Sequence, residues 1–181
     1  MMSSQKKAAC SAILAMAIFA TSCSQSSANR EIKAGWKSVP HVVNADPERE
    51  DRELELREFI FRREIAQPIR DEIVFISFGY ADDGNWIEPP YDYCDRFSDL
   101  RVQILPVSDA KLLERGLTSK TLGRVGHIYY VQILQWLDDH TVQVNHALYG
   151  GPLYGGGVEG AIYEFQGEMW RLKSGGQHHI E

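Results

Sequence analysis

The segment His127–Tyr149, HIYYVQILQWLDDHTVQVNHALY, decides the fold, because apolar and polar residues alternate on both sides of a short polar turn. Alternation with a period of two is typical of strands that bury one face. The three residues DDH at 138–140 interrupt the pattern with side chains that favour turns. The segment therefore predicts a long β-hairpin, with strands over 127–137 and 141–149.

A register that gives this hairpin one apolar face also predicts its cross-strand pairs. The expected pairs are Leu137 with Val142, Gln135 with Val144, Ile133 with His146, and Val131 with Leu148. A second hairpin is expected from 161–165 and 168–172 around Gln166-Gly167, with Tyr163 opposite Trp170.

On the N-terminal side of these hairpins, residues 46–67 are expected to form a helix that starts at Asp46 and Pro47 and ends before Pro68. Asp46 can cap free backbone amides, and proline already has a helical φ at the first position. Apolar residues fall on two sides of this helix: Leu54, Phe61 and Ile65 on one, and Leu56, Phe59 and Ile60 broadly opposite. The charged residues between them are expected to form a solvated surface: Arg52, Glu53, Arg57, Glu58, Arg62, Arg63 and Glu64.

Two further strands are expected in the middle of the chain. Residues 73–78 form a continuous β-prone run, typical of a strand buried on both faces. Residues 102–107 contain Pro106, which favours a sheet edge or a strand end. A short helix is expected over 91–100, whereas 109–123 has only a weak pattern. The expected fold class is α+β, with the N-terminal helix packed on a twisted antiparallel sheet built largely from the C-terminal hairpins.

The first 22 residues have the pattern of an export signal. Lys6 and Lys7 precede an apolar run from Ala8 to Ala20, which is too short to cross a bilayer, since crossing needs about 20 apolar residues. Ala20-Thr21-Ser22-Cys23 then resembles the lipobox of bacterial lipoproteins. The resemblance implies cleavage before Cys23, a diacylglycerol on its sulfur and a membrane anchor, and Ser24 then implies the periplasmic face of the outer membrane. The alternative is an ordinary cleaved signal and a secreted or periplasmic protein.

The expected domain organisation is therefore a signal peptide over 1–22, a lipidated N-terminus and flexible tether over 23–45, and a single α+β domain over 46–181. The chain has 181 residues, of which 44% are hydrophobic and 24% charged, which are ordinary globular proportions. Its formal net charge of −6 argues against nucleic acid as a partner. Cys94 would be the only thiol left beside a lipidated Cys23, and we expect it to be buried and inert.

No motif in the sequence predicts a cofactor, a metal ion or a catalytic residue. The glycine-rich segment 150–157 lies between expected strands and has no helix start to receive a phosphate, so we expect a flexible connection between the hairpins. Residues 80–90 lack the carboxylate spacing of a calcium loop. His127, His140 and His178-His179 lack the spacing of zinc ligands.

A ligand site is expected on the concave face of the sheet, with His146, Tyr149 and Tyr163 as candidates. This prediction favours a non-catalytic accessory domain that binds a small ligand or an envelope protein. One alternative is a small hydrolase or isomerase that uses His146 with a nearby carboxylate. Another is a purely structural envelope lipoprotein, which would engage its partner through 80–90 and the glycine-rich segment.

The expected order of helix, strand, short helix, strand and two hairpins resembles the cystatin-like and NTF2-like folds. That resemblance implies a sheet curved around the helix. The segments 57–62, 124–126 and 167–170 are similar to segments of bacterial proteins of uncharacterised function. Neither resemblance implies an activity.

Overall fold

The computed structural model describes residues 37–65, 73–114, 116–151 and 154–180. The expected signal peptide, Cys23 and most of the expected tether lie outside these ranges. In chain order, the elements are β1 (Ser38–Val39), α1 (Pro47–Ile65), β2 (Ile73–Ser77), β3 (Trp86–Ile87), the 3-10 helix η1 (Tyr93–Phe97), β4 (Gln103–Pro106), the 3-10 helix η2 (Val107–Asp109), β5 (Ala110–Leu113), β6 (Gly116–Ser119), β7 (Val125–Trp136), β8 (Thr141–Gly151), β9 (Tyr154–Gln166), β10 (Met169–Ser174) and β11 (Gln177–Ile180).

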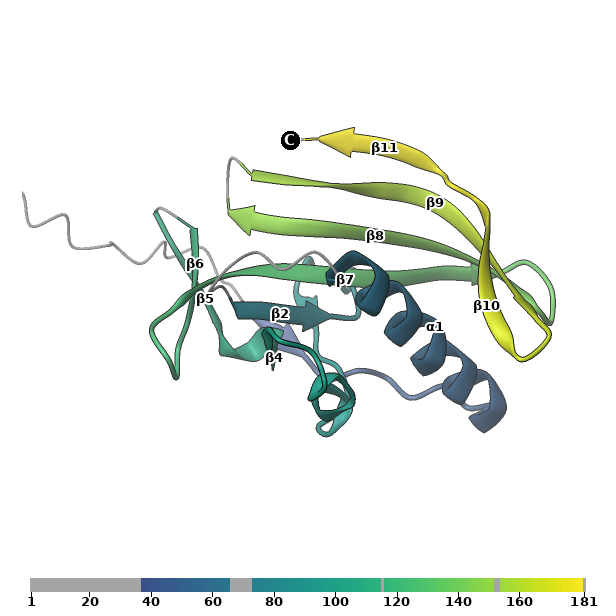
Figure 1. Cartoon of the computed structure of the whole chain (residues 1–181), viewed down its shortest axis with the longest axis horizontal. Coiled ribbons are helices and arrows are strands. Elements are labelled where there is room, and N and C mark those ends of the chain that lie inside the picture. The colour runs from purple at the N-terminus through teal and green to yellow at the C-terminus, as the bar shows by residue number, and fades with distance from the viewer. Residues whose placement is uncertain (1–36, 66–72, 115, 152–153, 181) are drawn as a thin grey trace, which may run out of the picture.

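Nine of these strands form one sheet, in which β10, β9, β8, β7, β2 and β4 are successive neighbours. β11 pairs with β9, and the β5–β6 hairpin joins the sheet through β7. Among the described strands of this sheet, β2 pairs in parallel with β4 and with β7, and the other pairs are antiparallel. Figure 1 shows the long strands β7, β8 and β9 side by side, with α1 in front of β7. The expected α+β class, with a large and mostly antiparallel sheet, is confirmed.

The first hairpin forms where it was expected, but its register differs from the prediction. Val131 pairs with His146, Ile133 pairs with Val144, and Trp136 pairs with Val142. Three residue steps on β7 therefore match two on β8, because the ladder shifts between Ile133 and Gln135. This bulge turns Trp136 towards the buried face and leaves Leu137 47% exposed.

The second hairpin also forms, with its turn one residue later than expected. Gly167 and Glu168 are its two turn residues, and both have a positive φ, of 59° and 66°. Two consecutive positive φ values are typical of a type I′ turn. The resulting register places Tyr163 opposite Leu172, and it places Phe165 rather than Tyr163 opposite Trp170.

The helix begins as the sequence predicted. The Asp46 carboxylate accepts hydrogen bonds from the backbone amides of Glu48, at 3.1 Å, and Arg49, at 3.4 Å. The expected helix end at Gln67 and Pro68 lies outside the described residues. The expectation of a wholly solvated charged surface is wrong for Glu53 and Arg57, which are buried.

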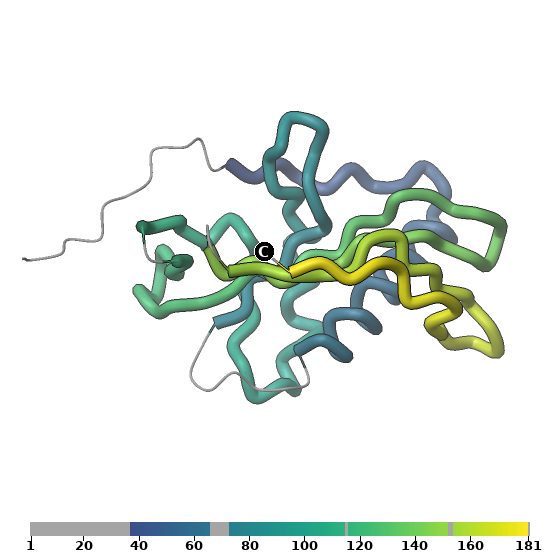
Figure 2. Tube along the Cα trace, turned by 90° about the horizontal axis from the view of Figure 1, so that it is seen from above, coloured from purple at the N-terminus to yellow at the C-terminus, as the bar shows by residue number. Residues whose placement is uncertain are grey.

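Both faces of the sheet carry a buried cluster, because alternate residues of β2 point to opposite faces. Val74 and Ile76 belong to the cluster that contains residues of α1, including Leu56 and Ile60. Ile73 and Phe75 belong to the other cluster, which also contains Trp86, Val107, Leu117 and Ile128. The prediction of a strand buried on both faces is therefore confirmed. Figure 2 shows the C-terminal end of α1 on one side of the sheet and the loop before β3 projecting from the other.

The shorter elements differ more from the predictions. The expected helix over 91–100 is reduced to η1, and the weakly patterned 109–123 contains the β5–β6 hairpin. β4 is the last strand of its path, which agrees with the edge position that Pro106 predicted.

Both ends of the described chain also form strands that were not expected. Most of the glycine-rich segment lies in β8 and β9 instead of forming a flexible connection, and β11 pairs with it. Residues 38–39, in the expected tether, pair with β3. Ordered contacts therefore begin before residue 46.

Candidate functional site

A cavity of about 420 Å³ lies between the last turns of α1 and the strands β7, β8, β9 and β11. In Figure 1, α1 ends in front of β7, and β8, β9 and β11 lie side by side beyond it. Cavities of about 300–1,000 Å³ are typical of small-molecule sites. The cavity therefore has the size of a ligand site.

The floor of this cavity is built from two rows of residues that cross four strands. One row contains Val131, His146, Val158 and His178. The adjacent row on the same face contains Tyr129, Leu148, Gly156 and Ile180. Because neighbouring strands lie about 4.8 Å apart, His146 and His178 are separated by about 10 Å. The floor is thus mainly apolar, with one imidazole under the helix and another near the sheet edge.

The polar end of the cavity comes from the last turn of α1. Arg63 donates to the Glu64 carboxylate through Nη2, at 2.7 Å, and Nε, at 3.1 Å. Arg63 Nη2 also donates to the Tyr163 hydroxyl, at 2.8 Å. Tyr163 is fully buried, and burial raises its pKa, although Arg63 acts in the opposite direction. The hydroxyl therefore stays protonated and remains available to donate a hydrogen bond.

His146 connects this polar end to the floor. Its Nε2 lies 3.4 Å from the Tyr163 hydroxyl, and its Nδ1 lies 4.0 Å from Glu64 Oε1. Burial lowers the pKa of His146; the nearby carboxylate of Glu64 raises it, and the charges of Arg63 and His178 lower it further. A lowered pKa keeps the imidazole neutral at neutral pH, so that one nitrogen donates and the other accepts.

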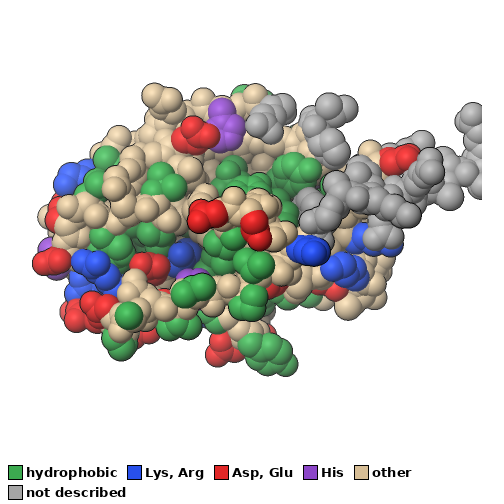
Figure 3. All heavy atoms as spheres, turned by 180° about the vertical axis from the view of Figure 1, so that it is seen from behind, with side chains coloured by type: hydrophobic (Ala, Val, Ile, Leu, Met, Phe, Trp, Pro, Cys, Tyr) green, Lys and Arg blue, Asp and Glu red, His purple; other side chains and the backbone are tan. Residues whose placement is uncertain are grey.

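The structure brings together two of the three expected site residues. His146 lines the cavity and the Tyr163 hydroxyl lies 3.4 Å behind it, whereas Tyr149 packs with the cluster on the opposite face, 5.9 Å from the Trp86 ring. Figure 3 shows that opposite face, with hydrophobic side chains across its middle. Alternation along one strand could have predicted this difference, because residues 146 and 149 are three positions apart and so point to opposite faces of the sheet.

Sequence reasoning missed Arg63, Glu64 and His178 as members of this site. The two helix residues belonged to a charged run that was expected to be solvated, and nothing in that run distinguishes them from their neighbours. His178 lies in β11, whose polar sequence carries no alternating apolar pattern. These contacts depend on tertiary placement, so local patterns carry no signal for them.

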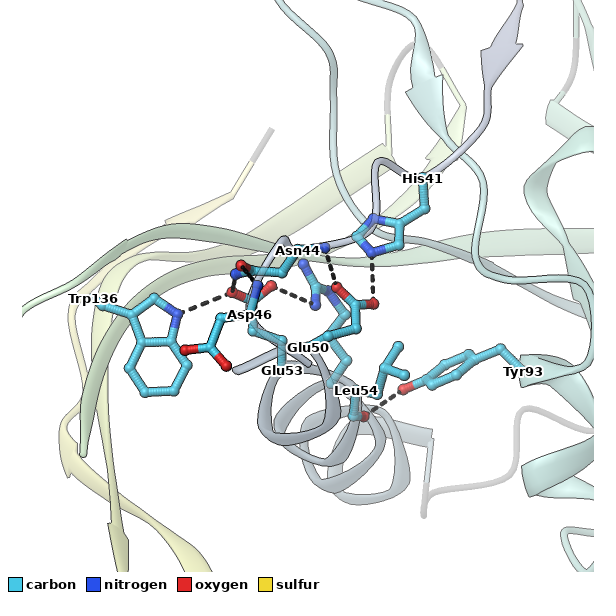
Figure 4. A network of polar contacts seen from close by, with 9 residues as sticks. His41, Asn44, Asp46, Glu50, Glu53, Leu54, Tyr93 and Trp136 are labelled. Atoms are coloured by element: carbon cyan, nitrogen blue, oxygen red, sulfur yellow. Dashed lines mark hydrogen bonds and ion pairs between the residues drawn. The ribbon is translucent and has the colours of Figure 1, made fainter. Parts of the chain in front are cut away.

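A second polar cluster, at the start of α1, has most of its polar groups paired with one another (Figure 4), although Arg57 Nε is buried without a hydrogen-bond partner among the described residues. Glu53 accepts hydrogen bonds from Trp136 Nε1 at 2.9 Å and Asn44 Nδ2 at 3.2 Å, and it pairs with Arg57 at 3.3 Å. The nearby Glu50 carboxylate contacts His41 Nε2 at 2.9 Å and accepts a hydrogen bond from the backbone N–H of Asn44 at 2.7 Å. These carboxylates hold residues 41–44 against the helix, which is a structural role.

The remaining candidates carry little chemistry. Burial raises the pKa of the Cys94 thiol to about 12, and the carboxylates of Glu88 and Asp95 act in the same direction. A thiol with so high a pKa is a poor nucleophile. Within the described ranges, no group of three or more His, Cys, Asp or Glu side chains is placed to hold a metal ion.

Comparisons with known proteins add no assignment to this geometry. Among the described residues, no helix combines the length and the apolar character needed to span a bilayer. No protein-family model, no curated protein and no solved structure matches the chain.

Proposed function

We propose that this chain is an exported, lipid-anchored domain that binds a small ligand, without catalysis, in the cavity between α1 and the sheet. The observation that carries the proposal is the cavity itself, whose apolar floor ends at Arg63, Glu64 and the buried His146. A few polar groups at one end of an apolar cavity are typical of sites that orient a bound molecule.

The way in which the helix meets the sheet supports binding over a filled core. Ile60 and Phe61 line one side of the cavity, and they belong to the same buried cluster as Ile65, against which Leu54 packs. The proposal includes the expected packing of α1 on a twisted sheet built largely from the C-terminal hairpins. That packing would bury the N-terminal part of the face and leave the part beyond Glu64 accessible.

The test of binding compares two leucines that are equally exposed. Leu172 lines the cavity and is 46% exposed, and Leu134, on β7, does not line it and is 45% exposed. Native mass spectrometry of the chain purified from membranes should detect a bound small molecule. Leu172→Trp should displace that molecule because the indole fills the cavity, and Leu134→Trp should retain it. Equal occupancy in both variants would place the ligand elsewhere, and an empty wild-type chain would refute the proposal.

The membrane anchor is a separate part of the proposal, supported by the lipobox resemblance at Cys23. Thirteen residues, 24–36, would separate the anchor from the first described residue, Lys37. Fully extended, such a tether spans at most about 45 Å, so the domain would stay close to the membrane surface. Intact-mass analysis of the membrane extract should show cleavage before Cys23 and fatty acyl groups on it. An unmodified full-length chain in the cytosol would refute this part.

Catalysis by His146 is the second candidate, because Glu64 supplies a carboxylate 4.0 Å from its Nδ1. This arrangement is suited to a general base in a small hydrolase or isomerase. For an enzyme, His146→Ala should abolish turnover while the thermal stability changes little. A large loss of stability without any reaction would instead assign His146 to structure and binding.

A further inference from the structure

The chemical class of the ligand can be inferred from the polar end of the cavity, and this inference rests on the proposed binding function. We propose that the ligand is an uncharged molecule with a hydroxyl group on an apolar body. Its hydroxyl would bridge His146 Nδ1 and Glu64 Oε1, and its apolar body would lie on the floor formed by Val131, Val158 and Leu148.

The neighbours of His146 determine which of its ring nitrogens carries the proton. Arginine can only donate, so the Tyr163 oxygen accepts the bond from Arg63 Nη2. Among the described residues, the acceptor within reach of the Tyr163 hydroxyl proton is His146 Nε2, at 3.4 Å. Since Nε2 accepts, the proton of the neutral ring lies on Nδ1. This chain of donors therefore presents an N–H group at the cavity end.

The Glu64 carboxylate lies close to this donor but does not contact it directly. His146 Nδ1 and Glu64 Oε1 lie 4.0 Å apart, which is too long for a direct hydrogen bond. One oxygen atom placed between them with two bonds of about 2.8 Å would have an angle of about 90° between those bonds. A hydroxyl group fits this position because it can accept from Nδ1–H and donate to the carboxylate. An ether oxygen can accept a hydrogen bond from Nδ1–H, but it has no proton to donate to the carboxylate.

The charged groups at the cavity end neutralise one another. Arg63 and Glu64 are paired at 2.7 Å, and His146 is neutral, so the formal charges of these three residues cancel. A ligand carboxylate at the bridging position would lie beside Glu64, and like charges at that distance repel. A ligand ammonium group would have to lose its hydration near Arg63. Neither sign of charge is favoured, which leaves an uncharged polar group.

The test uses four probes with the same eight-carbon chain: 1-octanol, methyl octyl ether, octanoate and octylammonium. Binding is measured by two-dimensional NMR titration of the full-length chain carrying Cys23→Ser, a change outside the described residues. We expect the dissociation constant of 1-octanol to be at least tenfold lower than that of either ion. It should also be at least about threefold lower than that of the ether. Leu172→Trp should weaken the binding of 1-octanol, and Leu134→Trp should leave it unchanged.

The same samples test the tautomer independently of any ligand. Long-range ¹H–¹⁵N spectra should show His146 protonated at Nδ1 in the wild type. Tyr163→Phe removes the hydroxyl that donates to Nε2, so the ring should become a mixture of tautomers and 1-octanol should bind more weakly. Glu58→Gln is the control, because Glu58 lies on the same helix but does not line the cavity. It should change neither the tautomer of His146 nor the binding of 1-octanol.

The outcomes separate the two proposals. If 1-octanol fails to bind and the other three probes also fail, the binding function and the hydroxyl assignment are both refuted. If probes bind and Leu172→Trp displaces them, but octanoate or octylammonium binds as tightly as 1-octanol, the binding function stands and the hydroxyl assignment is overturned. A wild-type ring protonated at Nε2 would also overturn the assignment.

Discussion

Arg57→Ala should destabilise the fold far more than Arg62→Ala, although Arg62 makes more polar contacts. Both residues lie on α1 and each has a glutamate four residues before it. Arg62 binds Glu58 at 2.9 Å, both oxygens of Asp99 and the Arg96 carbonyl. Arg57 makes one ion pair, with Glu53 at 3.3 Å. A count of ion pairs would therefore rank Arg62 as the more important residue.

Burial reverses that ranking. The Arg57 side chain is 5% exposed and its guanidinium lies 4.3 Å from the Phe78 ring centre, whereas the Arg62 side chain is 33% exposed. Burial lowers the pKa of Arg57, which shows the cost of desolvating it, and Glu53 acts in the opposite direction. Removing one partner of a buried pair costs about 3–5 kcal/mol, because the other charge stays buried. Exposed pairs contribute about 0.2–1 kcal/mol.

Urea denaturation followed by far-ultraviolet circular dichroism measures both changes. We expect a loss of about 3 kcal/mol in the free energy of unfolding for Arg57→Ala and at most about 1 kcal/mol for Arg62→Ala. The denaturant dependence, or m value, should be the same in both variants if they unfold in one step. Equal losses, or a larger loss for Arg62→Ala, would refute the argument that burial determines the energetics of this helix.

Three further predictions concern the site and its surroundings. In the folded chain the pKa of His146 is lowered from its ordinary value of 6.5. As the pH falls, His146 therefore becomes protonated in the unfolded chain before it does so in the folded chain, which favours unfolding. The wild type should therefore lose more unfolding free energy than His146→Gln between pH 7.5 and 5.5, with no such difference above pH 7.5, as denaturation at each pH would show. Gly157→Ala would place its Cβ 2.2 Å from Ala147 Cβ and should cost about 1–3 kcal/mol by thermal unfolding, whereas Gly175→Ala enters open space and should stay within about 0.5 kcal/mol. With Cys10 and Cys23 replaced by serine, Cys94 should react with a thiol reagent at pH 8 at least 100-fold faster in urea than in the native chain, because folding raises its pKa to about 12.

The sequence was most informative where a local pattern coincided with the tertiary structure. Alternation over 127–149 located the first hairpin, and Asp46-Pro47 located the start of the helix, because both signals act within a few residues. The register could not be obtained in the same way. A bulge adds a residue to one strand, and its position depends on which side chain, Trp136 or Leu137, packs better in the core.

The site was accessible to prediction only in part, for the same reason. His146 and Tyr163 each lie on a strand that could be predicted, but their shared face depends on the register of β8 with β9, which shifts between Val144 and His146. Arg63 and Glu64 reach that face from a helix whose charged residues alternate between burial and exposure, and sequence alone did not distinguish Arg57 from Arg62. The position of His178 depends on the pairing of β11 with glycines of β9.

The cavity itself follows from the lengths of the elements. α1 has 19 residues and spans about 28 Å, whereas β9 has 13 residues and spans about 43 Å. One helix cannot cover the full length of β7, β8 and β9, so part of the apolar face must be covered in another way. Large side chains could fill that part, but the adjacent floor row has Gly156 where such a side chain would stand. In the described part of the chain, a long sheet, one α-helix and a glycine in the floor together leave space that a bound molecule would fill.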